Sequence, residues 1–152
     1  MRTLINLSLT AATLAAAFAS PLAWSQEGSP VGLWKSIDDS SGKPTALIRI
    51  TEQKGELQGK IEKVFRAPTE DQNPKCVLCT DARKDQPIVG MTIVSGLKKS
   101  GDDYSGGEIL DPKNGKVYKS KLTLRDGGKK LEVRGYIGMP MLGRSQMWLR
   151  QE

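Results

Sequence analysis

Cys76 and Cys79 are the only cysteines in the sequence, and they stand at Cys-x-x-Cys spacing. Such a pair supports three chemistries: a local disulfide, thiol–disulfide exchange through a thiol of lowered pKa, and metal ligation. Metal ligation is the least favoured, because the chain has no second cysteine pair and no histidine. Only Asp81 and Asp85 lie nearby, and hard oxygen ligands match thiolates poorly. We therefore expect no metal and no cofactor, with a disulfide or a redox site at the cysteines.

The lack of histidine also bears on catalysis, because it removes Ser-His and Cys-His machinery and most bases that work near neutral pH. Two adjacent carboxylate pairs, Asp38-Asp39 and Asp102-Asp103, fall in predicted turns, where we interpret them as solvated turn formers. No glycine-rich run joins a strand to a helix, so no phosphate cradle is predicted. We expect a protein without catalytic residues that is not an enzyme.

The first 25 residues have the pattern of a cleavable signal peptide. Arg2 is the only charged side chain before Glu27, the centre from Leu9 to Ala19 is mostly Ala and Leu, and Ala23-Trp24-Ser25 places small residues before a cut. A transmembrane anchor is disfavoured, because the segment is Ala-rich and no basic stop-transfer flank follows it. We expect residues 1–25 to be removed, residues 26–152 to form one periplasmic or secreted domain, and no stable membrane anchor to remain.

Export changes the interpretation of the cysteines, because a disulfide is the default state of an isolated pair in an oxidising compartment. The net charge is +6, from 23 basic and 17 acidic residues. Basic and acidic residues are interspersed along nearly every predicted strand. This pattern favours a solvated surface over nucleic-acid binding, and it leaves weak attraction to an anionic envelope surface open.

Eight runs of strand length lie between turn signals, and several alternate polar and apolar residues with a period of two. The runs are Val31–Asp38, Ala46–Glu52, Leu57–Phe65, Gly90–Lys98, Tyr104–Asp111, Val117–Arg125, Lys130–Ile137 and Arg144–Arg150. The strongest turn is Asp111-Pro112-Lys113-Asn114-Gly115, because Asn-Gly readily takes the positive φ values of a tight hairpin. One polar and one apolar face per strand predict an all-β, eight-stranded antiparallel up-and-down barrel.

Two segments depart from this regular meander. The stretch from Arg66 to Pro87 holds three prolines and both cysteines, and we expect it to form one long Cys-containing loop that serves as a lid, a functional loop or a small embedded helix. The turn before the last strand contains Met139, Met141 and Leu142, an apolar group for a surface turn. We expect these side chains to cap the core, with a flap over the barrel mouth as the alternative.

Trp34 follows Gly32 at the start of the first strand, and Arg150 ends the last one. This pair resembles the barrel-closing device of lipocalin-like proteins, in which the indole plugs one end and the guanidinium packs across its ring. Two unrelated structural tryptophans, Trp34 and Trp148, are the alternative interpretation.

A series of short motifs extends over nearly the whole mature chain. They are Gly32-x-Trp34, Gly59-Lys60-Ile61, Cys76-x-x-Cys79, Pro87-Ile88-x-Gly90, Gly107-x-Ile109-x-Asp111-Pro112-x-Asn114-Gly115-Lys116-x-Tyr118, Arg134-Gly135-Tyr136-x-Gly138 and Gly143-Arg144-x-x-x-Trp148-x-Arg150. Together they resemble DUF2147, a family of exported bacterial proteins of unknown function. The resemblance implies export and a small β-barrel, and it implies no reaction or ligand.

The leading hypothesis is a non-enzymatic binding module of the cell envelope, because an eight-stranded barrel has room for packed side chains or one small ligand. The residues predicted to face inward are apolar with one hydroxyl group, which favours a small lipid-like or aromatic ligand. The residues expected to bind the ligand are Trp34, Ile48, Ile61, Tyr118, Leu122 and Val133. Ile50 is also expected to face inward. Two alternatives stay open: thiol–disulfide exchange at Cys76 and Cys79, and a structural or stress-related barrel that binds an envelope protein.

Overall fold

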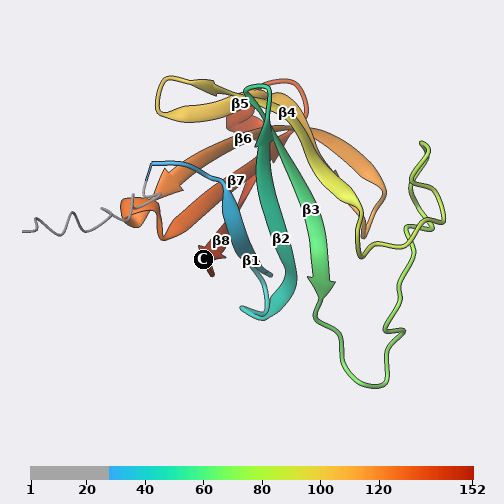
Figure 1. The fold of residues 1–152 in the computed structure, drawn as a ribbon. Helices are drawn as coiled ribbons and strands as arrows, with labels where there is room; N and C mark the ends of the chain where they lie inside the picture. Colours follow the sequence, from blue (N-terminus) through green and yellow to red (C-terminus); the bar gives the residue numbers. More distant parts are fainter. Residues whose placement is uncertain (1–27) are drawn as a thin grey trace, which may run out of the picture.

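Eight antiparallel strands form a closed barrel in a computed structural model, which describes residues 28–152 (Figure 1). Each strand pairs with the next one along the chain, and β8 pairs with β1. The strands are β1 (Gly32–Ile37), β2 (Pro44–Gln53), β3 (Glu56–Val64), β4 (Thr92–Ser100), β5 (Asp103–Asp111), β6 (Lys116–Arg125), β7 (Lys130–Tyr136) and β8 (Arg144–Arg150), with short 3-10 turns η1 (Asp126–Gly128) and η2 (Pro140–Leu142). The predicted up-and-down barrel is confirmed.

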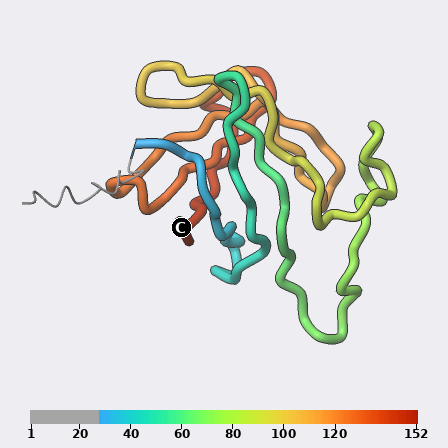
Figure 2. The backbone as a smooth tube through the Cα atoms, in the orientation of Figure 1, coloured from blue at the N-terminus to red at the C-terminus, as the bar shows by residue number. Residues whose placement is uncertain are grey.

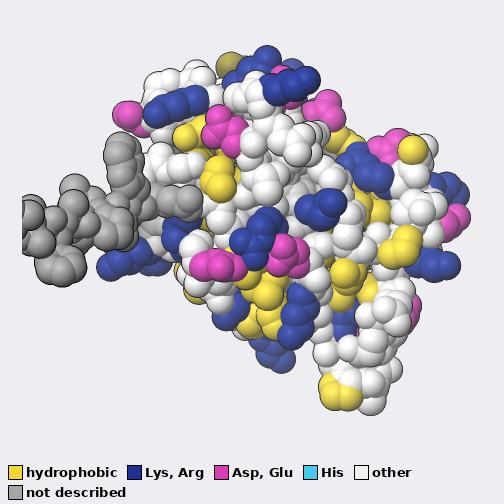
Figure 3. Space-filling view, viewed as in Figure 1, with side chains coloured by type: hydrophobic (Ala, Val, Ile, Leu, Met, Phe, Trp, Pro, Cys, Tyr) yellow, Lys and Arg dark blue, Asp and Glu magenta, His cyan; other side chains and the backbone are white. Residues whose placement is uncertain are grey.

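The predicted signal peptide, residues 1–25, lies outside the described residues. Within residues 28–152, no helix is long and apolar enough to cross a membrane. Over the face drawn in Figure 3, basic and acidic side chains are interspersed, as they are along the sequence.

Because the strands run up and down, successive turns lie at opposite ends of the barrel. We call one end the clamp end, which holds the turns between β2 and β3, β4 and β5, and β6 and β7. The opposite end is called the loop end. It holds residues 38–43, the long loop 65–91, the turn 112–115 and the turn 137–143.

Alternation along each strand builds the core. In β3, Leu57, Gly59 and Ile61 are buried, whereas the side chains between them are exposed. Gly59 is small for a reason: a Cβ atom there would lie 2.9 Å from the Cβ of Val94 on the neighbouring strand. Strand β7 repeats the pattern with Leu131 and Val133 inward. The dry faces of all eight strands therefore meet in one interior.

Trp34 and Arg150 meet at the clamp end. The Trp34 side chain is fully buried, and the guanidinium carbon of Arg150 lies 4.3 Å from its ring centroid. Arg150 donates from Nε, Nη1 and Nη2 to the carbonyl oxygens of Gly128, Val31 and Ser29 at 2.6, 3.0 and 2.6 Å. Burial lowers the pKa of Arg150 from its usual range. One side chain thus ties the last strand, the β6–β7 turn and the segment before β1 to the indole that fills this end.

We predict that Arg150→Ala lowers the free energy of unfolding by about 2–4 kcal/mol, because three carbonyl groups lose a charged donor and Trp34 loses its cation–π partner. Arg150→Lys, which keeps the charge but not the planar fork, should fall between Ala and the parent. Urea unfolding followed by tryptophan fluorescence measures both. An Ala variant as stable as the parent would contradict this role of Arg150.

Candidate functional site

Five of the residues predicted to bind a ligand form part of the core. Trp34, Ile48, Ile61, Leu122 and Val133 are at most 4% exposed. A hollow wide enough for a water molecule would leave accessible surface on the side chains that line it. Their side chains are therefore packed against protein atoms. Ligand binding by these residues stays a prediction, and a ligand would reach them only by displacing core side chains.

The sixth residue, Tyr118, lies apart from the other five. It is half-buried near the loop end of β6, and its hydroxyl oxygen accepts a hydrogen bond of 3.0 Å from Asn114 Nδ2 in the β5–β6 turn. The hydroxyl group predicted inside the barrel is therefore bonded to a turn at its edge.

Two buried polar atoms in the barrel were missed by the sequence analysis. Ser120 Oγ and Trp148 Nε1 have no hydrogen-bond partner among the described residues. An unpaired buried group of this kind costs about 1–3 kcal/mol. The alternation of β6 could have identified Ser120, because it lies between the inward positions Tyr118 and Leu122. Both atoms are available to a ligand only if the core around them opens.

The long loop 65–91 leaves β3 in a wide bend and then doubles back beyond the barrel wall (Figure 2). Residues 74–88 form the doubled-back part, which contains the disulfide. Cys76 and Cys79 are joined, which confirms the predicted disulfide, and both are almost fully buried. The Cys76 N–H donates to Gln86 O, and the Asp85 N–H donates to Cys76 O, each at 2.9 Å. The Ile88 N–H donates to Pro74 O at the base. The backbone of Cys76 is thus hydrogen-bonded to the returning half of the loop.

The loop is also fastened to the β5–β6 turn. Cys76 Sγ lies 3.6 Å from the Pro112 carbonyl oxygen. Gly115 has a φ of 72°, and a Cβ atom there would overlap the carbonyl group of Leu78. The glycine of the predicted Asn-Gly turn therefore has a second role, because its lack of a side chain makes room for the long loop.

The structure constrains the chemistry of the two cysteines. Both sulfurs are in the disulfide, and both residues are at most 1% exposed. Thiol–disulfide exchange requires an attacking thiolate to reach a sulfur, which this burial opposes. Within residues 28–152, no three His, Cys, Asp or Glu residues are grouped so that they could hold a metal ion.

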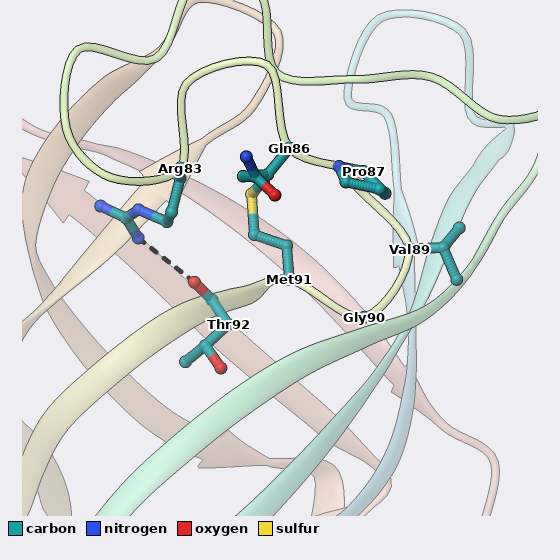
Figure 4. A pocket seen from close by; sticks show the side chains of 7 residues that line it. All are labelled: Arg83, Gln86, Pro87, Val89, Gly90, Met91 and Thr92. Carbon is teal, nitrogen blue, oxygen red and sulfur yellow. Dashed lines mark hydrogen bonds between the residues drawn. The ribbon is translucent and has the colours of Figure 1, made fainter.

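A shallow pocket of about 420 Å³, widely open to solvent, lies between the loop and the start of β4 (Figure 4). Pro87, Val89 and Met91 supply its apolar wall. Figure 4 shows the Met91 side chain extending toward Gln86, with Arg83 at one side. The full lining is Arg83, Gln86, Pro87, Val89, Gly90, Met91 and Thr92. Sequence analysis singled out this loop but did not predict the pocket.

Arg83 borders the pocket without offering it a free charge. Its Nη1 donates to the Thr92 carbonyl oxygen at 3.2 Å, and its Nε donates to both carboxylate oxygens of Asp81 at 3.1 Å. The side-chain hydrogen bond from Arg83 is the main reason that the pKa of Asp81 falls from 3.8 to about 2. Because the two charges compensate each other at neutral pH, the pocket suits an uncharged ligand better than an anion.

The apolar turn between β7 and β8 differs from its prediction. Met139, Met141 and Leu142 are 58–76% exposed, so the prediction that they cap the core is wrong. The predicted strand Lys130–Ile137 extends one residue too far, because β7 ends at Tyr136 and the Ile137 side chain is 69% exposed. The physical reason is local: Arg134 Nε donates to Pro140 O at 2.6 Å, and this bond helps fix the path of the turn.

The comparisons agree with the fold and the motifs. Residues 32–150 match the model of a family described as an uncharacterized protein conserved in bacteria, DUF2147. The chain belongs to this family. Protein HP1028 from the human pathogen Helicobacter pylori, described as belonging to the lipocalin family, has a similar solved structure, with a TM-score of 0.68 and 18% sequence identity over 82% of this chain and 84% of that one. At that identity the likeness shows the fold alone. A search of curated proteins found no match. This DUF2147 protein is therefore a lipocalin-like barrel, a fold compatible with a binding module.

We predict that the Asp81 carboxyl titrates with a midpoint near 2 and that Arg83→Gln returns it toward 3.8. The sign follows from the lowered folded-state pKa: the stabilisation is fully present above the unfolded value and is lost as the pH falls toward 2. Carbon-13 NMR of the side-chain carboxyl group measures both midpoints. An unchanged midpoint in Arg83→Gln would contradict the assigned pairing.

Proposed function

We propose that this protein is an exported, non-enzymatic binding module of the cell envelope, periplasmic or secreted, and that its ligand is small and apolar. Export is supported by the signal-peptide pattern of residues 1–25. The observation that carries the binding proposal is the pocket at the loop end, which is bordered by Pro87, Val89 and Met91. Its volume of about 420 Å³ falls in the range of small-molecule sites.

Three features of the pocket favour this ligand class. Its wall is apolar on one side, its guanidinium is paired with Asp81, and Gln86 and Thr92 supply polar groups for orientation. The disulfide supports the site because Cys76 is hydrogen-bonded to Gln86. Rigid loops on a barrel lose less conformational freedom on binding than flexible ones, which favours affinity.

The pocket can be tested with N-phenyl-1-naphthylamine, a small apolar dye whose fluorescence rises on binding. Val89→Asp should weaken dye binding by about tenfold or more, because a charge would stand in the apolar wall. Val117→Asp is the matched control, since Val89 and Val117 are 42% and 39% exposed and Val117 lies outside the pocket. Fluorescence titration gives both dissociation constants.

The barrel interior is the second candidate site, favoured by the unpaired Ser120 Oγ and Trp148 Nε1. Leu122→Ala would enlarge that interior. Dye binding that strengthens in Leu122→Ala and is unaffected by Val89→Asp would move the site from the pocket into the barrel and overturn the pocket assignment. Native mass spectrometry of protein purified from the envelope fraction would reveal a bound small molecule.

The disulfide gives a further prediction. Replacing both cysteines by serine (Cys76→Ser with Cys79→Ser) should lower the free energy of unfolding by only about 2 kcal/mol, because the ring is very short. The same change should weaken dye binding by about tenfold, because the backbone amide of residue 76, which donates to Gln86 O, is no longer held by the covalent link to residue 79. Circular dichroism should show an intact barrel. Full dye affinity in the serine variant would contradict the bracing role of the disulfide.

Thiol–disulfide exchange is the main alternative, and the burial of Cys76 and Cys79 speaks against it. A reduction potential below about −300 mV is typical of structural disulfides. A potential near that of thiol oxidoreductases, with rapid labelling of both thiols after mild reduction, would favour the redox alternative over the binding module.

A further inference from the structure

The exposed large apolar side chains are unevenly distributed over the barrel. Among residues 28–152 they are Val77, Leu78, Val89, Val117, Ile137, Met139, Met141, Leu142 and Met147. Seven of them lie in the loops of the loop end. Val117 is the second residue of β6, next to that end, and Met147 lies within β8. None lies in a clamp-end turn. Because scattered single apolar residues are normal but a concentration at one end is not, this end is a candidate contact surface.

The largest share belongs to the turn between β7 and β8. We call Ile137, Met139, Met141 and Leu142 the hairpin patch; their exposed fractions are 69, 58, 74 and 76%. The backbone beneath them is ordered by hydrogen bonds, since the Leu142 N–H donates to Met139 O at 3.1 Å and the Gly143 N–H donates to Pro140 O at 3.2 Å. The turn therefore holds these side chains out from the barrel in a defined shape.

The hairpin itself carries only basic charge, although Asp39 and Glu108 lie on neighbouring elements. Residues 134–144 include Arg134 and Arg144 and no acidic residue. Lys119 of β6 stands opposite Tyr136 of β7 on one side and opposite the exposed Glu108 of β5 on the other. Within residues 28–152, the only ion pair made by these three cations joins Arg144 Nε to Asp39 at 3.5 Å, with Arg144 73% exposed. By contrast, the long loop 65–91 holds basic and acidic residues in equal number.

We propose that the hairpin patch docks this protein onto the surface of a bilayer that contains anionic phospholipid. The apolar side chains enter the boundary between headgroups and acyl chains, and Arg134, Arg144 and Lys119 face the phosphates. A membrane fits better than a protein partner, because a hairpin tip with flexible Met side chains can insert between lipids, whereas a stable protein interface needs about 800 Å² per partner. This docking is separate from ligand binding in the loop pocket.

The test is flotation of the full mature protein with vesicles of phosphatidylcholine alone or with about one-third phosphatidylglycerol. We expect binding to the anionic vesicles at low salt, little to the neutral ones, and release at high salt. Combining Met141→Ser with Leu142→Ser should weaken anionic-vesicle binding at least tenfold. Val77→Ser with Leu78→Ser removes a similar exposed apolar pair from the long loop and should change binding less than twofold.

Charge variants distinguish the effect of the hairpin cations on vesicle binding from the effect of the protein's net charge. Arg144→Glu should weaken vesicle binding by at least tenfold, and Lys99→Glu, at the exposed clamp-end part of β4, should change it less than threefold. Val89→Asp should leave vesicle binding unchanged, so that failure of the pocket and failure of the docking surface are distinguishable. Three outcomes would each overturn the proposal. The protein could bind both vesicle types equally, or Arg144→Glu and Lys99→Glu could weaken vesicle binding equally. A hairpin-patch variant could also keep its vesicle binding while losing binding to an envelope protein.

Discussion

Strands β1 and β8 are joined by only three residue pairs, Trp34–Arg150, Lys35–Leu149 and Ser36–Trp148, and this short ladder turns an eight-stranded sheet into a barrel. The side chains of Trp34 and Arg150 also stack on each other, so these two residues take part both in closing the barrel and in filling one end of it. Closure removes both sheet edges and fixes which face of every strand is dry. With one end filled in this way, the longest loops and the exposed apolar residues are left to the other, where they are free to make contacts.

Most of the fold could be predicted because each strand carries its own signal. The predicted run Lys130–Ile137 and the observed strand Lys130–Tyr136 differ by one residue, since alternation of Leu131 and Val133 with polar neighbours fixes both strand and face. The contact between Trp34 and Arg150 was predicted for a different reason: the pair resembles the barrel-closing device of lipocalin-like proteins, in which a guanidinium packs across an indole ring. The signal-peptide pattern likewise predicted the disulfide, because an isolated cysteine pair is oxidised by default in an exported protein.

The candidate site could not be predicted because it depends on contacts between distant segments. The loop that lines the pocket contacts the β5–β6 turn where Cys76 lies against Pro112 and Leu78 lies against Gly115, and no local sequence pattern indicates either contact. The prediction that the side chains of the β7–β8 turn cap the core was wrong for a similar reason, since the hydrogen bond from Arg134 to Pro140 helps set the path of the turn. Barrels with a filled interior and barrels with a hollow one show the same alternation of polar and apolar residues. The close packing of Ile48 and Leu122 could therefore be seen only in the structure.

The most direct test of the central claim, that a small apolar ligand binds in the loop pocket and not inside the barrel, is nitrogen-15 NMR of the mature protein titrated with N-phenyl-1-naphthylamine. We expect shifts confined to the loop and the start of β4, above all at the amides of Gln86 to Thr92. The indole N–H signals of Trp34 and Trp148, which report on the interior, should stay in place. Large shifts of these indole signals with an unperturbed loop would contradict it.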